Sequence, residues 1–354
     1  MKLKTMVMTI WCLLAASLVL VQAAPQQQQP AGARGGRGAA QEPAPPPQPS
    51  QAKEVTVTGI PGVIAAGATW RLVWQGADNA DGIVGTSDGG LLFAQEQPSI
   101  IRKLDRNDWD SVYVKDTHGT GAIAIDAEGR IIGVQRTCTD PGRAPLPCTE
   151  PTKVAIIYPE KDRKVLAENI NGSPALRLND LTVSRNGTVY FNGGGMTFYL
   201  QPGGKPVSVG ENAGSNGIML SPDEKTLYMT NMGGLIRFDI QPDGTPTNRR
   251  DFVKFEGGGG DGMTVDSVGR IYVTASGGVQ VMSPEGKHLG TIPTPRSVIT
   301  VAFSGPDKKT LYVVGSGAVA PNGGEFALAP GYRNNAKTIY KIPTIAQGLK
   351  GRAK

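Results

Sequence analysis

Four oxygen-bearing side chains recur at matching places in the sequence, and together they could bind a metal ion. Asp81, Asn179, Asn216 and Asp261 each lie ten or eleven residues before an apolar segment, and three of them are followed directly by Gly. Two neighbouring carboxylates repel each other and lose hydration, which a bound cation would offset. Calcium accepts carboxylate, amide and water oxygens with flexible geometry, whereas a dedicated zinc site would use His or Cys. The pattern predicts a hard divalent cation, if the fold brings the four side chains together.

Asp261 follows four consecutive glycines in the segment GGGGDGM. Glycine is entropically costly to order, so a carboxylate placed after four of them indicates a backbone that must approach something closely. A metal ion is one candidate. The alternative is purely local, because Asp-Gly and Asn-Gly pairs are common turn formers whatever they face.

The apolar segments belong to a unit that occurs six times in the chain. Each unit has an alternating apolar strand, a turn rich in Asp, Gly or Lys, and a second apolar strand. Units of about forty residues, each with about four short strands, are typical of a β-propeller. We therefore predict an all-β, six-bladed propeller over residues 55–348; a β-sandwich explains the even spacing poorly. The second strands are expected to begin at Leu91, Ile131, Val189, Leu227, Ile271 and Leu311.

In a propeller the innermost strand of each blade lines a central channel, so the residue just before it lies near the axis. We call the six residues found by counting back from the second strands the ring positions. They are Asp81, Gly121, Asn179, Asn216, Asp261 and Thr300. The segment TWRLVWQG, near residue 70, could pair with the last blade and close the ring.

The N-terminal part of the chain reads as a targeting segment rather than as part of the fold. Residues 1–23 have a basic start, an apolar stretch and VQA before Ala24, which predicts a cleaved secretory signal peptide and a periplasmic or secreted protein. Residues 24–54 are rich in Pro, Gln and Gly, which predicts a disordered tether. No later apolar run has the length of a membrane span.

Charge and cysteine content narrow the function classes further. The formal net charge is +6 and falls to +4 once Lys2 and Lys4 leave with the signal peptide. The remaining basic residues are scattered, which argues against nucleic-acid binding. In an oxidising compartment, Cys138 and Cys148 are expected to form a disulfide; the alternative is two unpaired thiols.

Several longer motifs connect the chain to a known family. They are RLND, SNGIMLSPDEKTLYMTN, GDGMTVDSVGRIYV and VAFSGPDKKTLYV. With them, residues 70–343 resemble the SMP-30/gluconolactonase/luciferin-regenerating-enzyme family, six-bladed propellers with a divalent metal in the central channel. The resemblance implies that Asn216 and Asp261 bind the metal, with Asp81 at the place of a family Glu. It also implies that Asn179 lies beside the metal, where it contacts substrate or water, and that Arg177 contacts the substrate.

Three positions depart from the family pattern. Asp81 is one methylene shorter than the Glu of the family, Gly121-Ala122 stands where an Asn-Gly is frequent, and Gln135 and Arg136 stand where many lactonases have a His. The two departures in the second blade are expected to face the substrate, so Gln135 and Arg136 are candidate substrate-binding residues.

The resemblance implies an exported, gluconolactonase-like hydrolase that opens a sugar lactone or a related cyclic ester. One divalent metal ion, calcium by preference over zinc, manganese or magnesium, would polarise the ring carbonyl and lower the pKa of a bound water. Asp261 is the candidate catalytic residue, as metal ligand and proton acceptor. The alternatives are a non-catalytic propeller that binds carbohydrate or protein, and a metal-dependent lyase or isomerase acting on an oxidised sugar. A Ser–His–Asp hydrolase is disfavoured, because neither His118 nor His288 accompanies a G-x-S-x-G motif.

Overall fold

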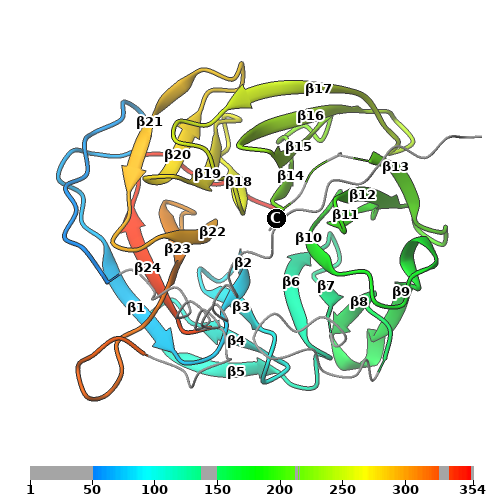
Figure 1. Ribbon diagram of the computed structural model, residues 1–354, viewed down its shortest axis with the longest axis horizontal. Coiled ribbons are helices and arrows are strands. Elements are labelled where there is room, and N and C mark those ends of the chain that lie inside the picture. Colours follow the sequence, from blue (N-terminus) through cyan, green and yellow to red (C-terminus); the bar gives the residue numbers. More distant parts are fainter. Residues whose placement is uncertain (1–50, 137–149, 212–213, 215, 327–334, 352–354) are drawn as a thin grey trace, which may run out of the picture. The chain divides into compact units, whose positions relative to one another are not determined.

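The computed structural model of the protein describes residues 51–136, 150–211, 214, 216–326 and 335–351. Within these residues the chain is nearly all β and forms six four-stranded antiparallel sheets. The sheets are arranged in a ring, which confirms the predicted six-bladed propeller (Figure 1). The predicted signal peptide, most of the predicted tether, and Cys138 and Cys148 lie outside the described residues.

The first three blades follow one another in sequence, each running from the innermost strand to the outermost. Blade 1 consists of β2 (Asp81–Gly85), β3 (Leu91–Gln95), β4 (Ile100–Leu104) and β5 (Asp110–Val114). Blade 2 consists of β6 (Thr120–Ile125), β7 (Ile131–Gln135), β8 (Lys153–Tyr158) and β9 (Lys164–Glu168). Blade 3 consists of β10 (Leu178–Val183), β11 (Val189–Gly193), β12 (Met196–Leu200) and β13 (Val207–Glu211).

The remaining blades complete the ring, and the last of them takes its outermost strand from the other end of the chain. Blade 4 consists of β14 (Ile218–Leu220), β15 (Thr226–Asn231), β16 (Gly234–Ile240) and β17 (Pro246–Lys254). Blade 5 consists of β18 (Met263–Val265), β19 (Ile271–Ala275), β20 (Gly278–Met282) and β21 (His288–Pro293). Blade 6 consists of β22 (Val298–Ser304), β23 (Thr310–Ser316), β24 (Lys337–Pro343) and β1 (Arg71–Gly76).

Two short 3-10 helices, η1 (Glu160–Asp162) and η2 (Ile170–Gly172), flank β9 in the chain. In the part of the chain that the structure describes, none of the helices has the length and apolar character of a membrane span.

The second strand of each blade is buried on both faces because it is sandwiched between two neighbouring blades. In β3, Leu91 and Phe93 pack against blade 6, while Leu92 and Ala94 pack against blade 2. Successive side chains of a strand point to opposite faces, so two buried faces require an uninterrupted apolar run. This is why these strands are the clearest elements in the sequence.

Pairing between the two ends of the described chain closes the ring. β1 runs antiparallel to β24, with Arg71 opposite Lys341 and Gly76 opposite Lys337. The expected role of the segment near residue 70 is thus confirmed. Closure removes the free edge that β24 would otherwise expose.

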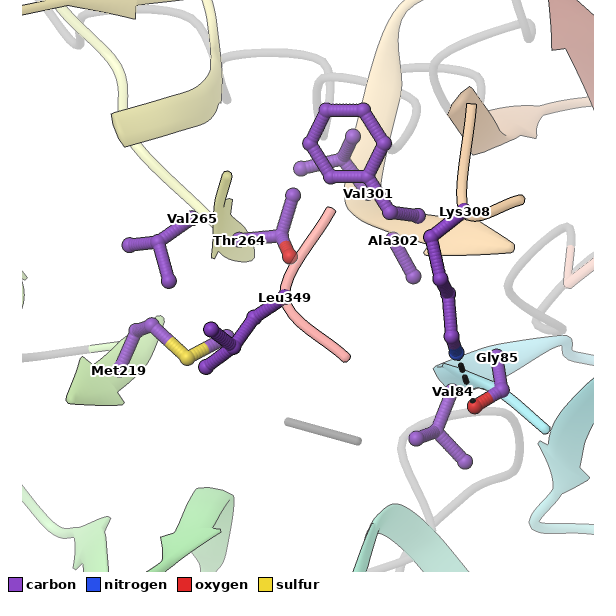
Figure 2. A pocket seen from close by; sticks show the side chains of 10 residues that line it. Val84, Gly85, Met219, Thr264, Val265, Val301, Ala302, Lys308 and Leu349 are labelled. Carbon is purple, nitrogen blue, oxygen red and sulfur yellow. Dashed lines mark hydrogen bonds between the residues drawn. The ribbon is translucent and has the colours of Figure 1, made fainter. Parts of the chain in front are cut away.

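The segment after β24 runs toward the centre of the ring, as Figure 1 shows in red, and fills one end of the channel. Gly348 forms a β-bridge with Asp266, and its amide donates to the Lys308 carbonyl at 2.7 Å. Leu349 then lies beside Met219 and Val265 around a cavity of about 20 Å³ (Figure 2). Since that volume holds about one water molecule, Leu349 leaves little free space between these residues and narrows the channel at this end.

Candidate functional site

The ring positions all lie where the innermost strands begin, at the end of the channel remote from Leu349. Neighbouring innermost strands contact one another around the ring, so these residues from all six blades are brought to one place. Four ring positions lie inside the innermost strands: Asp81 is the first residue of β2, Gly121 the second of β6, Asn179 the second of β10 and Thr300 the third of β22. The other two lie just outside: Asn216 precedes β14 by two residues, and Asp261 precedes β18 by two residues.

The glycines that follow Asp81, Asn216 and Asp261 are required by the next blade. A Cβ at Gly82 would lie 2.5 Å from the Cα of Ala122, and one at Gly262 would lie 2.8 Å from the Cα of Thr300. A Cβ at Gly217 would overlap the backbone carbonyl of Asp261. Such contacts are far shorter than van der Waals distances. The purely local turn explanation is therefore insufficient, because these glycines let adjacent blades meet at the channel.

The glycine run before Asp261 forms a tight loop. All four of Gly257–Gly260 have positive φ, and a Cβ at Gly260 would overlap the ring of Phe255. The amide of Asp261 donates to the carbonyl of Thr274 at 2.9 Å, which fixes its backbone to β19. Asp261 lies at the wall of a groove of about 690 Å³ that continues along Gly277, Gly278 and residues 293–298. The loop thus places Asp261, an acidic residue, in the lining of an open groove.

Asp81 is held by its own turn and by a cation from the next blade. Its Oδ1 accepts a hydrogen bond from the Gly82 amide at 2.9 Å, and its Oδ2 lies 3.5 Å from Nη1 of Arg136. The Asp81 side chain remains 27% exposed. A small ion or a substrate can therefore reach this carboxylate.

Arg136 is the centre of a buried polar network. Its Nη1 donates to Oε2 of Glu96 at 3.2 Å, and its Nη2 donates to the backbone carbonyl of Asn179 and to Asn179 Oδ1 at 3.4 Å. Burial disfavours the charge of this guanidinium, but the carboxylates of Glu96, Asp81 and Asp180 outweigh that effect and raise the pKa of Arg136. Arg136 is therefore a permanent cation beside Asp81 and Asn179.

Glu96 belongs to the site although the sequence reasoning missed it. Its side chain is 1% exposed, and its Oε1 lies 3.9 Å from Nη1 of Arg177, which is 40% exposed. A signal was present, because Glu96 and Arg136 each stand five residues after the start of a second strand, at Leu91 and Ile131. Superimposing the repeats would have paired an acid with a base at equivalent positions.

Lys337 is a second residue that sequence reasoning missed. It opens β24 and is buried, which lowers the pKa of its amine, while the carboxylates of Asp81 and Asp261 act in the opposite direction. Its Nζ donates to the Asn335 carbonyl at 3.3 Å. The influence of both carboxylates on one amine indicates that Asp81 and Asp261 face the same region.

Asn216 is tied to blade 3 through its backbone. The side-chain amide of Asn192 donates to the carbonyl of Asn216. Asp180, from the RLND motif, accepts hydrogen bonds from the amides of Leu181 at 2.9 Å and Ile218 at 3.3 Å, so its buried carboxylate joins blades 3 and 4. These bonds set the position of Asn179 relative to Asn216.

Gln135 lies apart from the other predicted residues. Its side-chain amide donates to the carbonyl of Thr117 at 3.4 Å, and it lines a separate cavity of about 200 Å³ with His118 and Lys153. A substrate-binding role for Gln135 stays a prediction.

The donor set at the ring fits a hard divalent cation. Asp81, Asn179, Asn216 and Asp261 are all partly exposed and offer only oxygen donors, which suit calcium better than softer metals. Among the described residues, no cluster of three or more His, Cys, Asp or Glu is close enough to hold a metal. A cation here would therefore need the amide oxygens as well as the two carboxylates.

Comparisons with known proteins agree with the fold and the motifs. A gluconolactonase of Zymomonas mobilis is 26% identical over 282 residues, which cover 67% of this chain and 76% of that protein. The structure of a Xanthomonas campestris gluconolactonase superposes with a TM-score of 0.61 at 20% identity, covering 86% of this chain and 99% of that one. A calcium-binding regucalcin from Agrobacterium tumefaciens superposes with a TM-score of 0.60 at 17% identity, covering 80% and 96%.

Residues 97–317, more than half of the chain, match the family model described as the SMP-30/gluconolactonase/LRE-like region. This match is independent of the blade geometry and covers Arg136, Arg177, Asn179, Asn216 and Asp261. The chain belongs to the SMP-30/gluconolactonase/LRE-like family.

Proposed function

We propose that the protein is an exported, metal-dependent lactone hydrolase of the gluconolactonase type. The observation that supports the proposal is the position of two Asp and two Asn residues, from four different blades, where the innermost strands begin around one channel. Family membership and the similarity to a gluconolactonase support a lactone as the substrate class.

Asp81, Asn179, Asn216 and Asp261 would hold the cation, and calcium is the ion that their oxygen donors favour. When bound, such a cation supplies Lewis acidity toward the lactone carbonyl. The calcium-binding regucalcin that shares the fold is consistent with this choice.

The reaction needs a water molecule to add to the carbonyl carbon and the ring C–O bond to break. We assign Asp261 as the acceptor of the proton that this water loses, because Asp261 is a carboxylate residue among those that line the groove. That proton then passes to the ring oxygen as it leaves, which gives the open hydroxy acid. Arg177, which is 40% exposed, would bind substrate hydroxyls or the oxyanion.

The proposal is tested by incubating the protein with a panel of aldonolactones and measuring the release of acid, with and without chelator. Activity should disappear with chelator and return with added calcium. Substrate binding that is indifferent to metal, with no acid released from any lactone, would favour a non-catalytic binding propeller instead.

Asp261→Ala should lower kcat about 10²–10⁴-fold, the usual contribution of a positioned proton acceptor. Thermal stability should change little, since the Asp261 side chain is only partly buried. Asp251→Ala is the matched control, because its carboxylate is 90% exposed on β17. Retained turnover in Asp261→Ala would remove Asp261 from the mechanism.

Export is proposed from the sequence of the first 23 residues alone. The mature protein should begin at Ala24, and mass spectrometry without reductant should show Cys138 joined to Cys148. A full-length chain in the cytoplasm, or two thiols open to alkylation in the mature protein, would contradict these proposals.

A further inference from the structure

Arg136 contacts the two other places where the chain departs from the family pattern, residues 81 and 121. A Cβ at Gly121 would overlap the guanidinium carbon of Arg136, so the absence of a side chain at residue 121 is what makes room for this group. Arg136 in turn lies 3.5 Å from Asp81. One local arrangement accounts for all three residues.

Arg136 has its donors directed to protein groups rather than to solvent. Its side chain is 1% exposed, and its two terminal nitrogens point to Glu96, Asp81 and the backbone and side chain of Asn179. A planar guanidinium can hold several acceptors in fixed directions at once, which an ammonium group cannot. The geometry points to a positioning role, not to direct contact with substrate.

We propose that Arg136, paired with Glu96 and seated on Gly121, is a positioning residue that orients Asp81 and Asn179 for cation binding. The metal part of this proposal rests on the proposed function. Because Glu96 compensates the charge of Arg136, the pair adds little net repulsion toward a cation, and its main effect is to fix the two ligands. Groups that orient metal ligands typically contribute 10–100-fold to affinity.

Removing Arg136 alone takes the nearer of two cations from the buried Glu96 and leaves only Arg177 at 3.9 Å, and such a variant can fail to fold. Two gentler variants avoid this problem. Gly121→Ala displaces the guanidinium without removing it, and the double variant Arg136→Gln/Glu96→Gln removes both charges while keeping hydrogen-bonding groups. Arg136→Lys keeps the positive charge but loses the planar guanidinium group with its fixed donor directions.

Calcium affinity of each folded variant is measured by titration calorimetry, together with kcat and KM. We expect Gly121→Ala and the double variant to bind calcium 10–100-fold more weakly, and Arg136→Lys not to restore wild-type affinity. Arg270→Gln is the control, since Arg270 pairs at 2.5 Å with the buried Asp266 at the narrowed end of the channel. It should lose stability without losing calcium affinity. Folded variants within twofold of the wild-type affinity would overturn the proposal.

Crystal structures of the wild type and of Gly121→Ala separate this proposal from the proposed function. A wild type that neither binds calcium nor opens lactones would refute the function. The structures would still test the positioning role, which requires the Asp81 and Asn179 side chains to shift when Arg136 is displaced. Unchanged side chains around a displaced Arg136 would refute it.

Discussion

At the scale of single residues, Lys308 shows how one side chain connects two blades. It has a φ of +56° in the turn between β22 and β23, where four other turns of the ring have Gly89, Gly129, Gly187 and Gly269. Its Nζ donates to the carbonyl of Gly85 in blade 1 at 2.8 Å (Figure 2). A left-handed conformation is unfavourable for a non-glycine residue, so this contact offsets a local cost.

Burial lowers the pKa of Lys308 to about 8, against an ordinary value of 10.5, although Asp88 acts in the opposite direction. Between these two pH values the unfolded chain binds more protons at this residue than the folded chain does, so this group makes stability rise with pH. The unfolding free energy of the wild type should therefore increase relative to Lys308→Met between about pH 8 and pH 10.5. Urea titrations at several pH values measure the difference. The same pH dependence of the unfolding free energy in the wild type and in Lys308→Met would show that burial does not lower the pKa of the Lys308 amine.

The places of the metal-ligand candidates in the fold could be predicted from the sequence because each residue stands at a fixed distance from an apolar run. The places of Asp81, Asn216 and Asp261 follow from the repeat alone, by counting back ten or eleven residues from the start of each second strand. Lys337 escaped because its place in the site depends on which neighbouring blade it meets, and no periodicity encodes that. Glu96 did carry a periodic signal, since it stands at the same repeat position as Arg136. A buried charge at a strand end is informative only once its partner is known.

At the scale of the elements, the second strands were predicted almost to the residue. The expected starts at Leu91, Ile131, Val189 and Ile271 coincide with those of β3, β7, β11 and β19, and burial on both faces explains this accuracy. Outermost strands carry no such signal. β5 is exposed at Asp110, Ser111, Val112 and Tyr113, so its composition reflects solvent on one side rather than packing on both.

The contact between adjacent innermost strands gives a prediction at this scale. Gly217→Ala places a methyl group against the Asp261 carbonyl, which is backbone and cannot rotate away. Overpacking of this kind typically destabilises by about 1–3 kcal/mol. Thermal melts should show this loss, and the displaced Asp261 should weaken calcium binding as well. Gly324→Ala is the control, because the nearest atom to its methyl group would be Asn322 Oδ1 at 3.5 Å, an ordinary contact, so its melting temperature should barely change. Equal stability of the two variants would contradict the proposed overpacking at Gly217.

At the scale of the whole described unit, the ring depends on residues that precede the first blade. Besides β1, the N-terminal segment contributes Val57, Ile60, Val63 and Ile64, all buried in the core shared by blades 5 and 6. The sequence reasoning placed the propeller from residue 55, yet it found no role for residues 55–64. Their packing against blade 5 is a tertiary contact that short apolar segments do not reveal.

A fragment of residues 77–354 should fail to fold, whereas a fragment of residues 51–354 should melt like the mature protein. Each buried aliphatic side chain contributes about 1.5–3 kcal/mol, so losing four of them is comparable with a typical total stability of about 5–15 kcal/mol. β24 would also lose one of its two neighbouring strands, with which it pairs from Lys337 to Lys341. Calorimetry and size-exclusion chromatography compare the two fragments. A cooperative transition in the shorter one would mean that ring closure contributes little.

The Leu349 segment narrows one end of the bore, which leaves the opposite end, where the innermost strands begin, as the doorway for solutes. If lactone and hydroxy acid both pass through this opening, they cannot do so at the same time, and an acid that is leaving delays the entry of the next lactone. Accumulated acid should then compete with fresh lactone, so that progress curves flatten earlier than consumption of the lactone alone requires.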